Sequence, residues 1–345
     1  MAESSLGVVL LYVAVLIVVS RLFGELFARL RQPEMVGEVL AGIALGPMML
    51  NLISPIHGID LFAMLGIYFL MFLAGYEEIS IEELIRAMRF RLLIASVISF
   101  FVPFMLCFLI FYIFLINDYM LSIFLSSVMA LTSLGVIIRL TSDMQVLRTR
   151  YGFRLAGMAV LNELIGLVLA GIALEFMLNG GDVNYLYVVA RLPLFFLVAG
   201  LAGYFVVPKV IGVAERVFRV RAFPFAALIA MILMFSYVSL LAGLHGVMGA
   251  LIVGFAMSRM RWDSITVRTV DQLKGFAHGI FIPIFFANAG LYVTREFLDV
   301  HGVIACSMAM TFIAGKMLAG YAITKIIGLS SHSPVSYTHL TLPTN

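Results

Sequence analysis

The sequence predicts an all-α polytopic membrane protein. Of its 345 residues, 63% are hydrophobic and only 12% are charged, which is more apolar surface than a soluble domain of this length can bury. A membrane-spanning helix needs about 20 consecutive, mostly apolar residues, and eleven stretches of the chain meet or approach that requirement. We therefore expect one transmembrane domain over residues 1–329, with no further folded domain in residues 330–345.

The eleven predicted spans follow one another along the chain, and the ninth is short and rich in glycine. In order they cover residues 6–23, 35–53, 59–75, 91–116, 120–140, 153–178, 185–208, 223–243, 245–258, 275–293 and 301–327. The first span has no basic residues before it and no small-residue cleavage site after it, so we expect a retained helix and no signal peptide. Cys107 and Cys306 both fall inside spans, and they therefore predict neither a disulfide framework nor a zinc site.

The Lys and Arg residues predict the orientation of these spans. All of them except Arg191, Arg295 and Lys316 lie on one side of the predicted membrane. Because basic residues gather on the cytoplasmic side, we expect the amino terminus outside and the end of the eleventh span in the cytoplasm. The net charge is only +3, so the basic residues indicate topology in a prokaryotic plasma membrane, with the lipid bilayer and not nucleic acid as partner.

Two ionisable residues lie deep inside apolar spans, Glu163 in the sixth and Lys316 in the eleventh. At about 1.5 Å per residue, each lies roughly 15–16 Å from the cytoplasmic end of its helix, near the middle of a hydrocarbon layer about 30 Å thick. A charge there costs about 2.5–3.5 kcal/mol on insertion scales and usually marks an ion pathway or proton relay. We therefore predict an ion transporter in which Lys316 is the charge partner of Glu163. A purely structural ion pair, or a Lys316 that extends to the interface, is the alternative.

Oxygen-bearing residues accompany Glu163 and predict a site for Na⁺ or K⁺. Glu163 carries a charge that either a proton or a cation can neutralise, and this competition is the minimum requirement for exchange. Asn162 adds an amide oxygen, and Thr132 and Ser133 lie in the middle of the fifth span, followed by Gly135. If that helix unwinds there, hydroxyl and backbone oxygens complete the site, since irregular backbone is tolerated only where it is buried or lines a cavity. In the alternative, Asn162 makes an ordinary interhelical hydrogen bond, and the two hydroxyls bond back to their own helix.

The chain contains a weak internal repeat. Residues 37–46 are echoed by residues 246–254, and residues 68–75 by residues 283–290. Each pair is displaced by seven spans, an odd number, so the two copies have opposite orientations, as in the inverted repeats of secondary transporters. The repeat partners of the fifth and sixth spans would lie beyond residue 345. We therefore expect a carboxy-terminally truncated chain whose residues 330–345 are either adapter-derived sequence or a natural disordered tail.

Three motifs resemble those of the monovalent cation:proton antiporters of the Kef and Nap type. Residues 31–47 resemble the opening signature of that family, residues 130–136 its unwound helix and residues 160–167 its ion-binding helix. Lys316 falls where the family places a Lys or Arg opposite its acids. The resemblance covers about residues 6–329. It implies exchange of Na⁺ or K⁺ for H⁺ by alternating access, a homodimer, and an inverted-repeat fold of thirteen helices, of which this chain contains eleven. It also implies a core of helices four to six and eleven to thirteen that moves against a dimerising scaffold.

The chain departs from the family pattern at the ion-binding helix. Asn162 stands where electrogenic, sodium-selective members carry a first Asp, and Glu163 stands where an Asp is usual. A single acid implies one-for-one, electroneutral exchange. The alternatives are a gated potassium-efflux system, a sodium-coupled organic-anion symporter with a second polar cluster, and an intramembrane enzyme. The sequence has no phosphate-binding glycine loop, no Gly-x-Ser-x-Gly elbow and no His-Glu-x-x-His, so we expect neither enzymatic activity nor a cofactor.

Overall fold

The computed structural model describes residues 2–78, 90–144, 146, 149–178, 185–218, 220, 222–258 and 264–327. Within these ranges the chain forms helices and no strand, so the predicted all-α class is confirmed. Seven helices of the described residues are long and apolar enough to cross a membrane. The expected tail, residues 330–345, lies outside the described residues.

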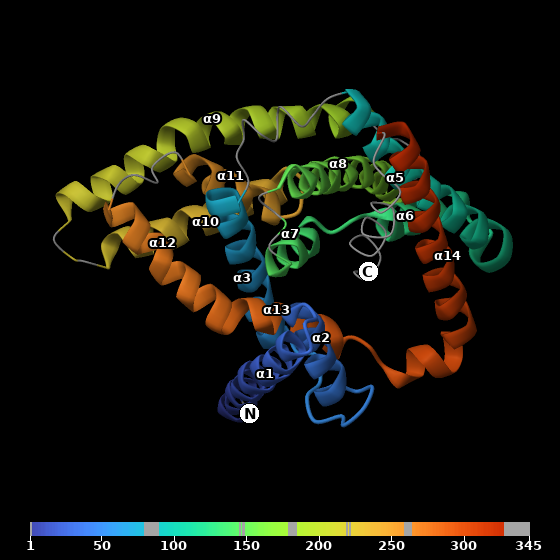
Figure 1. Cartoon of the computed structure of the whole chain (residues 1–345), viewed down its shortest axis with the longest axis horizontal. Coiled ribbons are helices and arrows are strands. Elements are labelled where there is room, and N and C mark those ends of the chain that lie inside the picture. The colour runs from blue at the N-terminus through green and yellow to red at the C-terminus, as the bar shows by residue number, and fades with distance from the viewer. Residues whose placement is uncertain are drawn as a thin grey trace. The chain divides into compact units, whose positions relative to one another are not determined.

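The helices follow the order of the predicted spans (Figure 1). They are α1 (Ala2–Arg29), α2 (Glu34–Leu45), α3 (His57–Leu73), α5 (Phe90–Ile110), α6 (Tyr119–Ala130), α7 (Leu134–Asp143), α8 (Arg150–Leu178), α9 (Tyr185–Val217), α10 (Phe223–Leu241), α11 (Val247–Ser258), α12 (Ser264–Phe276), α13 (Ile282–Leu291) and α14 (Arg295–Ile327), with short π-helical segments η1 (Ala74–Glu78), η2 (Phe111–Ile116) and η3 (Ala277–Phe281). Each of the eleven predicted spans corresponds to a helix, and the fifth corresponds to the pair α6 and α7.

The chain divides into two compact units. The first contains α1, α2, α3, α10, α11, α12, α13 and most of α9. The second contains α5, α6, α7, α8 and α14 from Gly302 onward. The second unit therefore gathers the fourth, fifth, sixth and eleventh predicted spans, which are the helices that the family resemblance assigns to the core.

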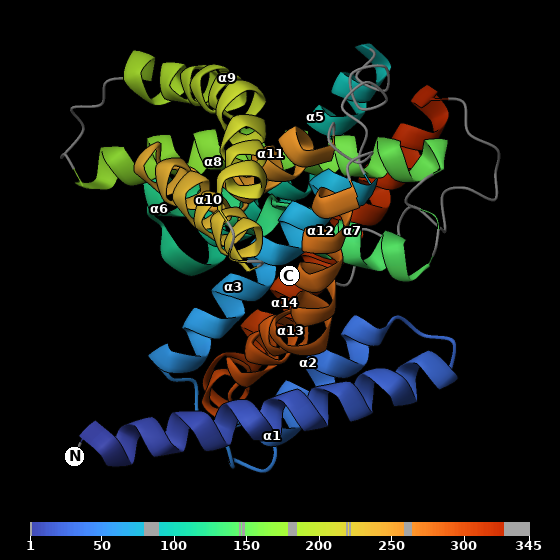
Figure 2. The same cartoon turned by 90° about the vertical axis from the view of Figure 1, so that its left-hand side faces the viewer.

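Glycines let the helix backbones of the first unit touch. A Cβ atom on Gly42 of α2 would overlap the carbonyl group of Ala287 in α13, and one on Gly290 of α13 would overlap the carbonyl oxygen of Val39 in α2. Figure 2 shows α1 running alongside this pair, and α1 contacts both helices. Small residues at helix interfaces are typical of membrane proteins, where packing replaces the hydrophobic effect between helices.

The same close approach occurs where α11 meets α3 and its continuation η1. A Cβ atom on Gly75 would lie 2.6 Å from the carbonyl oxygen of Leu251, and one on Gly254 would overlap that of Phe72. Gly75 and Gly290 end the two copies of the repeat, residues 68–75 and 283–290, and each packs on the helix that belongs to the opposite copy. This reciprocal pairing is the arrangement that an inverted repeat produces.

Two boundaries differ from the sequence-based expectation. The second span was predicted to reach residue 53, but α2 ends at Leu45, just before Gly46 and Pro47, because a helix rarely continues into the residue before a proline. The predicted connection between the ninth and tenth spans contains the polar helix α12, which leads through η3 into α13. Hydropathy detects helices that lie in hydrocarbon, so it gives no signal for a polar one.

The contact between α2 and α13 predicts the effect of an added methyl group. We expect Gly42→Ala to destabilise the protein by about 1–3 kcal/mol, the usual cost of overpacking, because the new Cβ meets backbone that cannot move aside. Gly200→Ala in α9 is the matched control, since no atom beyond its own turn of helix backbone lies within 4 Å of the Cβ position among the described residues. The melting temperature of the purified protein in detergent measures both. Equal melting temperatures would contradict the assigned packing.

Candidate functional site

The fifth predicted span is interrupted in its middle. α6 ends at Ala130 and α7 begins at Leu134, and the backbone between them is extended (Figure 1). In an uninterrupted helix the Leu134 N–H would donate to the Ala130 carbonyl. The break leaves both groups without a helical partner, so the unwinding expected at Thr132 and Ser133 is present.

The two released backbone groups meet opposite charges. The Lys316 Nζ of α14 donates to the Ala130 carbonyl oxygen at 3.0 Å, and the Leu134 N–H donates to the Glu163 carboxylate of α8. The end of α6 carries partial negative charge and the start of α7 partial positive charge. The ammonium and the carboxylate therefore stabilise the two sides of the break.

Lys316 is almost completely buried, with 1% of its surface exposed. Besides the Ala130 carbonyl, its Nζ contacts the Thr132 Oγ1 at 2.6 Å and the Ser99 carbonyl oxygen at 3.4 Å, and it lies 5.4 Å from the centroid of the Phe312 ring. No ion pair between Lys316 and Glu163 occurs among the ion pairs of the described residues. The ammonium is bonded to neutral oxygens of α5 and of the helix break and is enclosed by the protein.

Asn162 links the helix break to α5. Its Nδ2 donates to the Ser99 Oγ and to the Thr132 Oγ1, both at 3.2 Å. Thr132 thus accepts from both Lys316 and Asn162 through one oxygen. The Asn162 side chain makes the interhelical hydrogen bonds that were expected if it does not bind a cation. Its carbonyl oxygen nevertheless has no hydrogen-bond donor.

Two buried oxygens at the break have no hydrogen-bond donor, the Asn162 Oδ1 and the Glu163 Oε2. A buried acceptor without a donor costs free energy, and a cation or a proton removes that cost. Ser133 precedes α7 and makes no side-chain bond to the α7 backbone, while its carbonyl oxygen accepts from the Ile137 N–H at 3.1 Å. Of the predicted site residues, Thr132 is hydrogen-bonded to both Asn162 and Lys316. Glu163 is connected to the helix break through its bond with the Leu134 N–H. Ser133 is part of the break only because it lies between α6 and α7 in the sequence.

Ser99 contacts the helix break but is not among the residues predicted from the sequence. This residue lies in the middle of α5 and supplies its hydroxyl to Asn162 and its carbonyl to Lys316. The signal that would have found it is a serine inside an apolar span, four residues before a proline.

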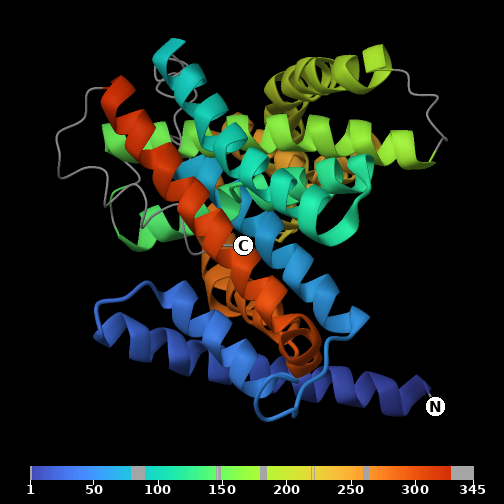
Figure 3. The same ribbon diagram turned by 90° about the vertical axis from the view of Figure 1, so that its right-hand side faces the viewer.

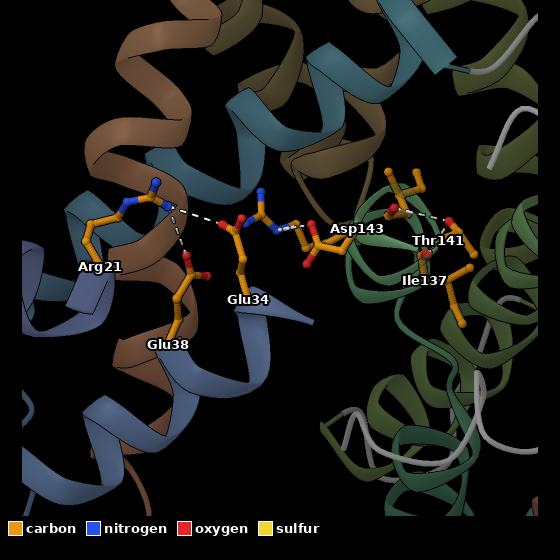
Figure 4. A network of polar contacts seen from close by, with 8 residues as sticks. Arg21, Glu34, Glu38, Ile137, Thr141 and Asp143 are labelled. Carbon is orange, nitrogen blue, oxygen red and sulfur yellow. Dashed lines mark hydrogen bonds and ion pairs between the residues drawn. The ribbon is translucent and has the colours of Figure 1, made fainter. Parts of the chain in front are cut away.

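Other charged residues pair away from the helix break. In the first unit, the Arg21 Nη1 lies 3.4 Å from the Glu34 Oε2 and 3.7 Å from the Oε1 of Glu38, which is fully buried (Figure 4). In the second unit, the Nε of Arg139 lies 3.2 Å from the Oδ1 of Asp143, one turn further along α7. We interpret both as structural ion pairs.

Comparisons with known proteins identify the family to which the chain belongs. The family model described as "Sodium/hydrogen exchanger, transmembrane" matches residues 13–342. The chain is 27% identical over 323 residues to the probable Na⁺/H⁺ antiporter GerT of Bacillus cereus, covering 93% of this chain and 84% of that protein. It is also 27% identical to the Na⁺/H⁺-K⁺ antiporter GerN of the same organism, over 92% of this chain and 77% of GerN.

A solved structure shares the fold. The sodium/proton antiporter MjNhaP1 of Methanocaldococcus jannaschii superposes with a TM-score of 0.74 at 16% identity, over 96% of this chain and 82% of MjNhaP1. The resemblance that the motifs indicated is therefore confirmed. The chain belongs to the transmembrane sodium/hydrogen exchanger family and is a monovalent cation:proton antiporter, a secondary transporter and not an enzyme.

Proposed function

We propose that the protein exchanges one Na⁺ or K⁺ for one H⁺ by alternating access, with Glu163 as the site that proton and cation share. One observation carries this proposal: the Asn162 Oδ1 and the Glu163 Oε2 are buried acceptors without donors, beside a helix break that lies in the middle of a membrane span. Oxygen atoms of this kind replace the hydration shell of a monovalent cation.

The cation takes its ligands from both sides of the break. Glu163 supplies the charge and Asn162 the amide oxygen, while Ser133 adds oxygen from the extended backbone. Thr132 completes the site by holding Asn162 and Lys316 through its hydroxyl group. When the proton is bound, Glu163 is neutral and the cation loses its main ligand, so the two cargoes exclude each other.

The position of Lys316 supports electroneutral exchange. Its ammonium is bonded to three oxygens of the protein, so we assign it a fixed charge that stays the same throughout the cycle. Glu163 then neutralises either one proton or one cation, and the loaded site has the same net charge in both directions. A second titrating acid, which would change this balance, is absent at position 162.

All the proposed site residues belong to the second compact unit. This supports alternating access in which the site moves together with its cargo, as the family resemblance implies. GerN is named as an antiporter of both Na⁺ and K⁺, so both cations remain in the proposal. A gated potassium-efflux system remains the alternative. The family assignment disfavours an organic-anion symporter.

We place the protein in a prokaryotic plasma membrane with its amino terminus outside, because nearly all Lys and Arg residues fall on one side of the predicted membrane. We also propose a homodimer. Large apolar side chains on α1, among them Leu11, Val18 and Leu22, are 58–63% exposed, and lipid together with a second copy would cover them.

Removal of the Glu163 charge tests the shared site. We expect Glu163→Gln to reduce exchange to the background of empty vesicles, because glutamine keeps the size of the side chain but releases no proton. Proteoliposomes that contain the full-length protein and a pH-sensitive dye, given a pulse of Na⁺ or K⁺, report the exchange. Glu25→Gln on α1 is the matched control and should keep wild-type rates. Exchange by a folded Glu163→Gln protein would exclude Glu163 from the mechanism.

The stoichiometry gives an independent test. We expect the rate of Na⁺-driven proton movement to be unchanged when a gradient of the permeant anion thiocyanate sets a membrane potential in K⁺-free vesicles. One net charge per cycle would feel about 2.3 kcal/mol per 100 mV, roughly a 50-fold bias in the transport equilibrium. A clear acceleration or inhibition by the potential would show that a second group titrates during the cycle.

A further inference from the structure

A proline in the interior of α5 releases one backbone carbonyl. In a regular helix the N–H of residue 103 would donate to the carbonyl of Ser99, but Pro103 has no N–H. The Ser99 carbonyl instead lies 3.4 Å from the Lys316 Nζ. Since a membrane interior supplies no water to a released carbonyl, the ammonium and this carbonyl satisfy each other.

The same proline is the place where α14 approaches α5. Gly315 comes directly before Lys316, and a Cβ atom at Gly315 would lie 2.8 Å from the Pro103 Cα. Figure 3 shows α14 running beside α5. Pro103 therefore acts in two ways. Its backbone is the surface against which Gly315 of α14 packs, and its missing N–H leaves the Ser99 carbonyl free for Lys316.

The Ser99 hydroxyl acts on the other side of the site. Ser99 is 2% exposed, and its Oγ accepts from the Asn162 Nδ2, whose second hydrogen bond goes to the Thr132 Oγ1. Because the carboxamide is planar and its nitrogen carries two hydrogens, these two bonds fix the direction of the Asn162 Oδ1. That oxygen is left without a donor and is presented for a ligand.

Ser96, one turn earlier on α5, shows the ordinary behaviour of a serine in an apolar helix. It is 1% exposed, and its Oγ bonds back to the Leu92 carbonyl oxygen at 2.9 Å. The two serines share a helix and the same degree of burial, but only Ser99 bonds to a residue of the site.

We propose that Ser99 and Pro103 are positioning residues of the antiport site, on the basis of the function proposed above for Asn162 and Glu163. The Ser99 hydroxyl orients the Asn162 amide toward the cation, and the Ser99 carbonyl, released by Pro103, holds Lys316 at the helix break. Neither residue touches the cation. The Ser99 hydroxyl thus affects the cation affinity through its bond to Asn162. The Ser99 carbonyl affects the position of the Lys316 ammonium through its bond to Nζ.

Substitution of Ser99 tests the first bond. Ser99→Ala removes the hydroxyl but keeps the carbonyl that Lys316 uses. We expect the KM for Na⁺ or K⁺ to rise about five- to tenfold with little change in maximal rate, the size expected for loss of one buried hydrogen bond. Ser99→Thr keeps a hydroxyl and should restore most of the affinity, and Ser96→Ala should leave the KM unchanged. A KM for Ser99→Ala within twofold of that for Ser96→Ala would overturn this part of the proposal.

A double-mutant cycle tests the second bond without relying on transport. Pro103→Ala restores an N–H that competes with Lys316 for the Ser99 carbonyl. We therefore expect Pro103→Ala to raise the melting temperature less in the wild-type background than in Lys316→Gln, where that carbonyl has lost its ammonium. Equal increments in the two backgrounds would show that Pro103 does not act through Lys316.

Glu163→Gln in the same assays separates this proposal from the function on which it rests. Persistent exchange by Glu163→Gln means that the proposed function fails. Loss of exchange in Glu163→Gln, together with a wild-type KM in Ser99→Ala and equal increments in the cycle, means that only the positioning role fails.

Discussion

The site depends on one helical hydrogen bond that does not form, the bond from the Leu134 N–H to the Ala130 carbonyl. In hydrocarbon neither group finds water, so each must bond to protein. The carbonyl accepts from Lys316 and the N–H donates to Glu163. One interruption of the backbone thus provides a bonding partner for both Lys316 and Glu163, and each charge is stabilised by the end of the helix whose partial charge is opposite.

Lys316 and Glu163 differ in how completely their charged groups are hydrogen-bonded. Lys316 is bonded to three oxygens and is almost completely buried, so its charge is compensated on several sides. Glu163 keeps an oxygen without a donor, and so does the preceding residue, Asn162, through its amide oxygen. A group with an unfilled acceptor can exchange one positively charged ligand for another, whereas a saturated one cannot. This asymmetry supports the proposal that Glu163 is the carrier and Lys316 a fixed charge.

Close contacts between helix backbones are the main feature of the first compact unit. Glycines bring its helix backbones into contact, at Gly42 and Gly290 between α2 and α13, and at Gly75 and Gly254 where α11 meets α3 and η1. Such contacts leave no room for an added methyl group. The first unit therefore relies on close backbone contacts at these two interfaces, whereas the second unit contains the helix break with Lys316 and Glu163.

The sequence alone determined the spans, their predicted orientation and the two lone charges, because hydrocarbon demands long apolar helices and makes every buried charge conspicuous. It also indicated the break at Thr132, where hydroxyls and a glycine interrupt an apolar run. Only the tertiary structure decided that Lys316 bonds to carbonyls and not to Glu163, and that Ser99 belongs to the site. These bonds join residues far apart in the chain, and local pattern does not specify which helices pack together or how deeply each one sits.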